Sequence, residues 1–347
     1  MYQVKVNSAA LRINGPRETF HAHDHDQLRK AAHVFHTEWH GIRSATSCLP
    51  GHKIGISADS GIEGDAIRRI HGYLYEHKIA KVVYQGFSRN ADILARALKK
   101  LMKGDFEQYV VSHVTSSQFE YRFEVDQQIS ILSCLRDRVI SKIGSVKPRF
   151  YTVIPEYWHR TIYNAPPRLL KYVAASRVNS SIAFVPLENT LRKNLFTNII
   201  GAQNSSAISQ VWSVNIPSGL ESIVDTKKCR VVGYQRGSNL HDRMSEATVV
   251  LNCTLAECQP MTQLEAISVG TPCLTGRLGL EELSDHKLTR LMEVTEIDSP
   301  HSITEAIDRL IYHMRDTSVN FPEELRSYAD QRVQLSLASL AEFLDFS

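Results

Sequence analysis

Two glutamates in the second half of the chain are placed where they could bind hydroxyl groups. Glu257 and Glu265 stand in the stretch TVVLNCTLAECQPMTQLEAISVG, whose apolar run predicts a strand and whose residues from Met261 onward predict a helix. Glu257 then precedes the helix and Glu265 lies inside it, so both can face the carboxyl ends of the strands, where open α/β sheets bind ligands. Two carboxylates suit vicinal hydroxyls, and the N–H groups of a helix start suit a phosphate or a sugar oxygen.

Two cations near the start of another predicted helix point to an anion. Arg192 and Lys193 open the segment RKNLFTNIIGAQNS, whose apolar periodicity predicts a helix. Cations at this end oppose the helix dipole, which favours acidic groups there. A bound phosphate would remove the conflict, and exposed surface cations are the alternative.

Together these segments resemble the donor site of GT-B glycosyltransferases of the retaining family-4 type. The hallmark of that family is a Glu, seven residues, a second Glu followed by Ala, and then Gly-x-Pro. Here these positions are occupied by Glu257, Glu265, Ala266, Gly270 and Pro272. The similarity continues upstream through VVGYQRGSNLHDRMSEATVVLN and LRKNLFTNIIGA, and covers residues 172–330.

The resemblance implies a role for each matching residue. Glu265 would bind the ribose of a nucleotide-sugar, Glu257 a hydroxyl of the transferred sugar, and Arg192 with Lys193 the diphosphate. The loop after Glu257 would line the sugar pocket, although it lacks the Gly-aromatic-Gly run that is common in the family. Its residues are Cys258, Gln259, Pro260 and Met261, and a second donor-contacting loop would comprise Gly279, Leu280 and Glu281.

The activity implied is transfer of a sugar from a nucleotide-diphosphate-sugar to a hydroxyl acceptor, with retention at the anomeric carbon. The nucleotide-sugar is then a co-substrate, and the resemblance implies neither a cofactor nor a required metal. A catalytically silent module that binds a nucleotide or sugar is the alternative. A Rossmann dehydrogenase is disfavoured because the chain lacks the G-x-G-x-x-G fingerprint.

The first half offers weaker candidates. His113 ends the predicted strand QYVVSHV, at a place where related enzymes often have a His that touches the donor sugar. A catalytic role and a purely structural His are both open. The loop DSGIEGD brings Gly61 and Gly64 to the end of another predicted strand, where they would form either an acceptor-side loop or a plain turn.

The run HAHDHD raises the question of a metal site. Its side chains are those of His21, His23, Asp24, His25 and Asp26, and such residues are common metal ligands. Their strict alternation favours a solvated turn instead. No metal ligand is therefore expected in this chain.

The composition is that of a folded globular protein. Hydrophobic residues make up 43% and charged residues 22% of the 347 residues, and no run approaches the roughly 18 apolar residues that a membrane span needs. Six cysteines are scattered without a C-x-x-C pair, and the first residues do not resemble a secretory signal. Buried free thiols and a location in the cytoplasm, or peripheral to a membrane, are expected.

The alternation of short apolar runs with longer amphipathic ones predicts an α/β fold. Strands are expected at 4–13, 52–58, 80–86, 108–114, 149–155, 181–187, 207–216, 229–235, 248–254 and 271–276. Helices are expected at 26–39, 66–79, 91–103, 124–143, 192–205, 220–226, 240–247, 261–270, 302–316 and 323–346. This pattern indicates two Rossmann-like domains of the GT-B kind facing an interdomain cleft. We expect an acceptor-side domain at 1–168, a donor domain at 169–325 and a helix at 326–347 that packs back across both.

Charge is divided unevenly along the chain. Residues 1–171 carry 25 Lys and Arg against 16 Asp and Glu, whereas residues 172–347 carry 15 against 21. A basic acceptor side suggests an anionic acceptor: an acidic glycan, a lipid carrier or membrane surface, or a nucleic acid with a hydroxylated base. The alternative is a solvated basic face around Lys99, Lys100 and Lys103.

Overall fold

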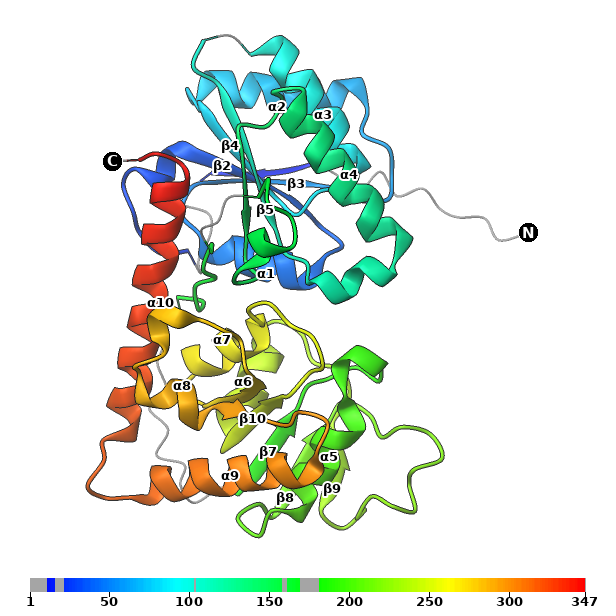
Figure 1. The fold of residues 1–347 in the computed structure, drawn as a ribbon, viewed down its shortest axis with the longest axis vertical. Helices are drawn as coiled ribbons and strands as arrows, with labels where there is room; N and C mark the ends of the chain where they lie inside the picture. The colour runs from blue at the N-terminus through cyan, green and yellow to red at the C-terminus, as the bar shows by residue number, and fades with distance from the viewer. Residues whose placement is uncertain (1–10, 16–21, 103, 158–160, 169–180, 347) are drawn as a thin grey trace. The chain divides into compact units, whose positions relative to one another are not determined.

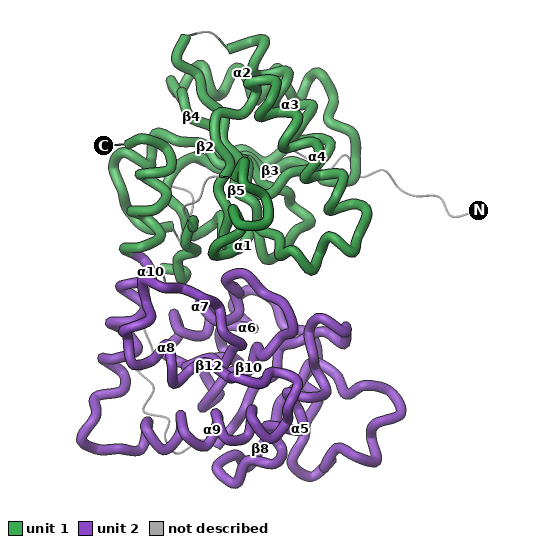
Figure 2. The backbone as a smooth tube through the Cα atoms, in the orientation of Figure 1, with its two compact units in different colours: residues 1–168, 334–347 green, residues 169–333 purple. Residues whose placement is uncertain are grey.

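The computed structural model describes residues 11–15, 22–102, 104–157, 161–168 and 181–346 (Figure 1). The chain divides into two compact units, the first of residues 1–168 with 334–347 and the second of residues 169–333 (Figure 2). Each unit is built on one six-stranded sheet with helices around it. The prediction of two Rossmann-like α/β domains is confirmed.

The sheet of the first unit is parallel except at one edge. Its strand order is β1-β3-β2-β4-β5-β6, and β1 runs antiparallel to β3. The order reverses between β2 and β4, which makes this pair the topological switch point of the unit. The strands are β1 (Arg12–Asn14), β2 (Ala31–His36), β3 (His52–Ile56), β4 (Lys81–Gln85), β5 (Glu107–Ser112) and β6 (Lys142–Ser145).

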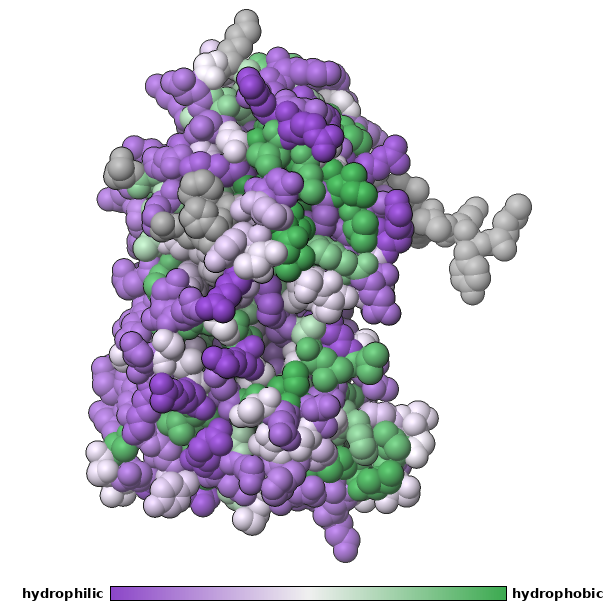
Figure 3. Space-filling view, viewed as in Figure 1, coloured by the Kyte–Doolittle hydropathy of each residue, from purple (hydrophilic) through white to green (hydrophobic). Residues whose placement is uncertain are grey.

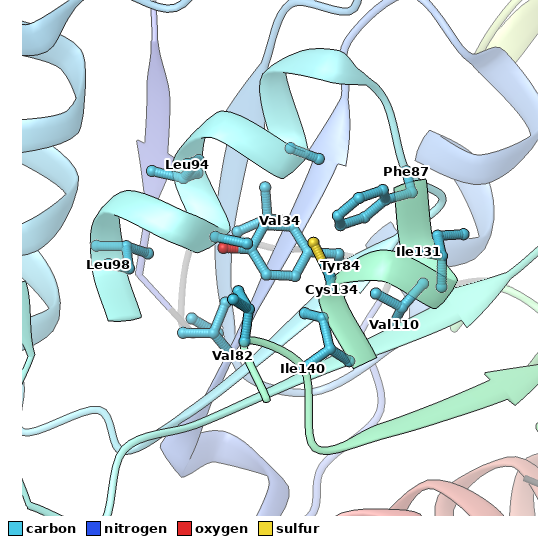
Figure 4. Packing of buried hydrophobic residues seen from close by; sticks show 14 of the residues in the cluster. Val34, Val82, Tyr84, Phe87, Leu94, Leu98, Val110, Ile131, Cys134 and Ile140 are labelled. Atoms are coloured by element: carbon cyan, nitrogen blue, oxygen red, sulfur yellow. The ribbon is translucent and has the colours of Figure 1, made fainter. Parts of the chain in front are cut away.

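Helices of the first unit follow its strands. They are α1 (His40–Cys48), α2 (Gly64–Glu76), α3 (Arg89–Leu101) and α4 (Arg122–Arg136), with short 3-10 turns η2 (Leu28–Lys30), η3 (Ser116–Glu120) and η4 (Phe150–Thr152). Ser88 caps α3 by accepting hydrogen bonds from the N–H groups of Asn90 and Ala91. Buried residues of α3 and α4 pack on the sheet around Tyr84 and Phe87 (Figure 4).

The largest error of the sequence analysis lies at 26–39, where a helix was expected. Residues 31–36 instead form β2, a central strand that pairs in parallel with both β3 and β4. His33 and His36 are fully buried within it, so the strand shows no alternation of apolar and polar faces. The helix of this region, α1, comes after the strand.

Three smaller predictions are also wrong. The helix expected at 124–143 ends at Arg136, and its last residues form β6. Residues 150–152 form the turn η4 where a strand was expected, and residues 220–226 form turns where a short helix was expected. The first two errors concern short apolar runs, in which strand and helix patterns are hardest to tell apart.

The sheet of the second unit is parallel throughout, in the order β12-β11-β10-β7-β8-β9. Here the order reverses between β7 and β10, so the loops that follow these two strands flank the switch point. The strands are β7 (Ile182–Val185), β8 (Gln210–Ser213), β9 (Cys229–Val231), β10 (Val249–Asn252), β11 (Cys273–Gly276) and β12 (Glu293–Val294).

The second unit's helices pack in pairs, α5 with α9 and α6 with α7. A Cβ atom built on Gly201 of α5 would lie 2.6 Å from Ile303 of α9, so glycine permits the close approach of these helices. The helices are α5 (Leu195–Asn204), α6 (Ser238–Glu246), α7 (Met261–Ser268), α8 (Lys287–Leu291), α9 (Pro300–Arg315) and α10 (Phe321–Phe343), with turns η5 (Leu191–Lys193) and η6 (Glu281–Leu283). Residues of α10 from 334 onward belong to the first unit.

The described residues include buried cysteines and an apolar surface patch. All six cysteines are buried thiols. Among the described helices none combines the length and the apolar character needed to cross a bilayer. Hydrophobic side chains gather on the surface over α4, where Phe123 and Ile129 are exposed (Figure 3).

Candidate active site

The predicted cations and the first predicted glutamate meet at the switch point of the second unit. Arg192 and Lys193 lie in η5, in the connection after β7, and Glu257 lies in the loop after β10. Nζ of Lys193 donates to Oε1 of Glu257 at 2.7 Å, and Nη1 of Arg192 donates to the same oxygen at 3.2 Å. The carboxyl ends of β7 and β10 thus carry a compact group of two cations and one carboxylate.

This group differs in one respect from the sequence expectation. Arg192 and Lys193 are not at an exposed helix start, since they lie in the turn before α5 and their side chains are 38% and 23% exposed. The Glu257 side chain is 19% exposed. The anion that balances these cations within the structure is therefore Glu257 itself.

Glu265 and the two predicted donor loops lie along the same edge of the sheet. Glu265 is half-buried on α7, which directly follows the Glu257 loop. Cys258, Gln259, Pro260 and Met261 are buried, with Pro260 at the N-cap of α7. Gly279 adopts a left-handed φ of 74° after β11, Leu280 is buried and Glu281 is exposed.

A buried arginine that the sequence analysis missed supports the Glu257 loop. Nη2 of Arg332, on α10, donates to Oε1 of Gln259 at 2.9 Å. Arg332 is fully buried, and this burial lowers the pKa of its guanidinium. The sequence did contain a sign of this burial, because Arg332 lies at helical spacing between Tyr328 and Ser336, on the buried face of α10.

Three further buried side chains at this edge have unused hydrogen-bonding capacity. Asn252 ends β10, Thr254 follows it, and Gln263 lies in the first turn of α7. Both polar side-chain atoms of Asn252, Oγ1 of Thr254 and Oε1 of Gln263 have no hydrogen-bond partner among the described residues. Buried polar atoms normally find partners, so a ligand group or a water fits here.

In the first unit His113 belongs to a chain of hydrogen-bonded side chains. Nε2 of His113 lies 2.8 Å from Oε1 of Gln85, and Nε2 of Gln85 lies 3.1 Å from Nδ1 of His33. Nε2 of His33 lies 3.0 Å from the carbonyl oxygen of Pro50, which can only accept. A neutral His33 therefore donates from Nε2 and accepts at Nδ1, and His113 donates from Nε2 to Gln85.

Burial keeps these histidines neutral. It lowers the pKa of His113 to about 4 and holds that of His33 well below the usual range, with Lys53 contributing in the second case. His113 directly follows β5, as predicted, so its neutral ring lies at the carboxyl edge of the first sheet. Its Nδ1 is the basic nitrogen of this tautomer.

The loop that contains Gly61 is held by neighbouring side chains. Glu38 accepts hydrogen bonds from Oγ of Ser57 and from the N–H of Ala58. Asn90 donates to the carbonyl of Ser57 and accepts from the N–H of Ile62. Gly61 is exposed in this loop and Gly64 is the first residue of α2, so both lie after the carboxyl end of β3.

The HAHDHD run makes local contacts. Asp24 pairs with Arg29 and Arg168, and His23 lies 2.8 Å from the carbonyl oxygen of Pro166. Nδ1 of His25 accepts from the N–H of Leu28, and Asp26 lies 3.4 Å from Arg29. His21 lies outside the described residues. Within the described part of the chain, no three His, Cys, Asp or Glu side chains are grouped as metal ligands.

Lys99 and Lys100 lie away from these edges. They are exposed in the last turn of α3, which runs back from the carboxyl end of β4 toward the start of β5. The negative end of the helix dipole accounts for lysines there. Lys103 lies outside the described residues.

Comparison with known families identifies the core of the second unit. Residues 195–313 match the model of glycosyl transferases group 1. This part of the second unit is thus similar to that family. The matched segment contains Glu257 and Glu265, and Arg192 and Lys193 lie just before Asn194, which precedes it. No curated protein sequence matches the chain.

Similar solved structures extend the likeness to both units. HepE from Anabaena, solved with UDP-glucose, has a TM-score of 0.61 at 12% identity, over 91% of this chain and all of that one. Sucrose-phosphate synthase from Thermosynechococcus elongatus has a TM-score of 0.54 at 15% identity, over 86% and 84%. A UDP-forming trehalose-phosphate synthase from Burkholderia xenovorans, solved with glucose-6-phosphate, has a TM-score of 0.54 at 10% identity, over 91% and 99%. The two units of the chain thus share the GT-B fold of these structures.

Proposed function

We propose that this protein transfers a sugar from a nucleotide-diphosphate donor to a hydroxyl acceptor, and that the donor binds at the switch point of the second unit. The main support is the meeting of Arg192, Lys193 and Glu257 at the carboxyl ends of β7 and β10. Ligands of open α/β sheets bind where the strand order reverses. The matching family model and the UDP-glucose bound by HepE support the same class of ligand.

The charges of these side chains indicate which part of the donor each of them binds. Two cations face a single carboxylate, so the group keeps a net positive charge that suits a diphosphate. When the diphosphate takes the two cations, Glu257 is released to accept a hydroxyl of the sugar. Glu265, farther along α7, binds the ribose.

The proposed reaction proceeds with retention. Arg192 and Lys193 stabilise the negative charge that develops on the departing diphosphate, which is the electrostatic part of catalysis. An oxygen of that diphosphate takes the proton of the acceptor on the same face, so no side-chain base is needed. We propose no resident cofactor and no required metal, because the two cations already neutralise the leaving group. His113 is proposed to hold the sugar through its neutral ring.

We further propose an anionic acceptor that binds the first unit, whose part of the sequence is basic. With Lys99 and Lys100 far from the carboxyl edge, the candidate contacts are cations that follow strands at that edge. Arg89 is exposed at the start of α3, and Lys147 follows β6. Acidic glycans, lipid carriers or anionic membrane surfaces, and nucleic acids share the charge that these cations would recognise.

Transfer and its stereochemistry are tested in one assay. The purified protein is incubated with UDP-, GDP- and ADP-sugars and a fractionated acceptor extract, and nucleoside diphosphate release is followed together with the anomeric proton of the product by NMR. The proposal expects acceptor-dependent release and an α-linked product from an α-linked donor. Binding without release in any combination would support the non-catalytic module, and an inverted product would overturn retention.

A further inference from the structure

The loop that carries Glu257 is fixed to the neighbouring turn by two asparagine side chains. Nδ2 of Asn198 donates to the carbonyl of Cys253 at 2.9 Å, and its Oδ1 accepts from the N–H of Cys253 at 3.1 Å. Nδ2 of Asn194 donates to the same carbonyl at 3.1 Å. Both backbone polar groups of Cys253, the first residue after β10, are thereby bound by side chains from the start of α5.

These asparagines also tie the loop to other elements. Nδ2 of Asn194 donates to the carbonyl of Ile297 at 2.6 Å, in the segment before α9, and Nδ2 of Asn198 donates to the carbonyl of Asn194 at 2.8 Å. The N–H of Leu255 donates to the carbonyl of Arg192 at 2.9 Å. Asn198 is fully buried, and buried amide bonds of this kind define one geometry because leaving any of them unmade is costly.

The backbone conformation of Asn194 also contributes to this arrangement. It stands between the cations of η5 and the first residue of α5, in the left-handed conformation with φ 54° and ψ 38°. Asparagine is among the few non-glycine residues that adopt this conformation readily. One residue therefore turns the chain after Lys193 and at the same time holds the loop of Glu257.

We infer that Asn194 and Asn198 are positioning residues that set the place of Glu257 relative to Arg192 and Lys193. Neither needs to touch the donor. Their contacts fix the backbone of Cys253, from which Glu257 is four residues away, so the carboxylate meets the sugar while the cations meet the diphosphate. The catalytic part of this inference rests on the proposed function, and its structural part does not.

The test uses Asn194→Gly in the full chain, because glycine keeps the left-handed turn and removes only the side-chain contacts. Hydrogen exchange of residues 253–257 should become about tenfold faster or more, since the loop opens locally at lower cost. Affinity for inorganic pyrophosphate, which needs only the cations, should not weaken. With UDP-glucose as donor, kcat should fall by about tenfold while KM changes by less than about threefold.

Gln203→Ala is the matched control. Gln203 lies at the other end of the same helix, α5, and its Oε1 accepts a hydrogen bond from the backbone N–H of Asp225. It should leave exchange at 253–257 and kcat unchanged. Asn198→Asp keeps the acceptor for the Cys253 N–H and loses the donor, so it should reproduce the effect of Asn194→Gly.

Unaltered exchange at 253–257 in Asn194→Gly would overturn the inference, as would faster exchange with unchanged kcat. Pyrophosphate binding weakened about tenfold would also overturn it, because the asparagine would then act on the cations. A wild-type protein that turns over no nucleotide-sugar would instead contradict the proposed function, and exchange would still decide the structural part.

Discussion

Nζ of Lys193 lies 2.7 Å from Oε1 of Glu257, so a cation expected to bind the diphosphate is already paired with the carboxylate expected to bind the sugar. Both residues are partly buried, where screening is weaker than at the surface. A diphosphate must therefore compete with Glu257 for its site. The pairing links the two halves of donor recognition and leads to the first prediction.

Glu257→Gln should strengthen the binding of a nucleoside diphosphate and weaken catalysis. Without the carboxylate, Lys193 and Arg192 keep their full charge for the ligand, so the dissociation constant should fall by about three- to tenfold. Turnover with the nucleotide-sugar should drop, because the amide is a poorer acceptor for a sugar hydroxyl as positive charge develops. Calorimetric titration with the nucleoside diphosphate checks the first part, and weaker binding in this variant would contradict it.

Two glycines in helices should respond oppositely to alanine. Gly201→Ala places a Cβ atom 2.6 Å from Ile303, so it should destabilise the protein by about 1 to 3 kcal/mol. Gly72→Ala, on α2, meets nothing within 4 Å and should stabilise by about 0.5 to 1 kcal/mol through helix propensity. Denaturant unfolding of both variants measures the difference, and a stabilising Gly201→Ala would show that α5 and α9 are less closely packed.

The buried histidines make stability depend on pH. Burial lowers the pKa of His36 and of His113 to about 4, whereas both titrate near 6.5 when unfolded. Between pH 6.5 and 4 the unfolded chain therefore binds protons that the folded chain does not, so the free energy of unfolding should fall as the pH falls. For fully buried His36, the decrease in the free energy of unfolding is at most about 3 kcal/mol.

Urea unfolding at pH 7 and pH 4.5 gives the slope, which His36→Gln should reduce. His301→Gln serves as the control because His301 is exposed on α9. A free energy of unfolding that is constant over this pH range would contradict the burial of these rings as neutral groups.

Charge reversal can locate the acceptor face. Arg89→Glu with Lys147→Glu, at the carboxyl edge of the first sheet, should raise the acceptor KM by about tenfold at low salt and flatten its dependence on ionic strength. Lys99→Glu with Lys100→Glu, in the last turn of α3, should leave the acceptor KM unchanged and cost about 0.3 to 1 kcal/mol per residue of stability. Equal effects of the two pairs would argue for a diffuse field, and a KM indifferent to salt would reject an anionic acceptor.

The sequence predicted the fold well where periodicity extends over whole elements. The helices α2, α3, α9 and α10 and strands such as β3, β4, β5, β7 and β10 follow from apolar patterns that burial imposes. It failed at β2, where His33 and His36 interrupt the pattern although both rings are buried and hydrogen-bonded. Such polar groups are stabilised by partners far along the chain, such as Pro50 and Ser88, which local periodicity does not reveal.

The candidate site was also predicted only in part from the sequence. The family resemblance nominated Glu257, Arg192 and Lys193, helped by the unusual place of two cations near a helix start, and the strand order explains why they meet. Asn194 and Asn198 were not predicted as site residues, because they bind backbone groups of Cys253. Every residue has such backbone groups, so the sequence does not reveal this contact. The pairing of Glu257 with the cations also needed coordinates, since it depends on the distance between two loops.

The most direct test of the account is thermal unfolding with a panel of UDP-, GDP- and ADP-sugars, applied to the wild-type protein and to Arg192→Ala with Lys193→Ala. At a hundredfold excess over the dissociation constant, a bound donor adds about 2.7 kcal/mol to the free energy of unfolding. We expect at least one nucleotide-sugar to raise the melting temperature of the wild type and of the control Arg243→Ala, whose ion pair with Glu246 lies elsewhere on the same unit. The same compound should leave the double variant unshifted. An equal shift in the double variant, or no shift of the wild type by any member of the panel, would contradict a donor site at the β7 and β10 switch point.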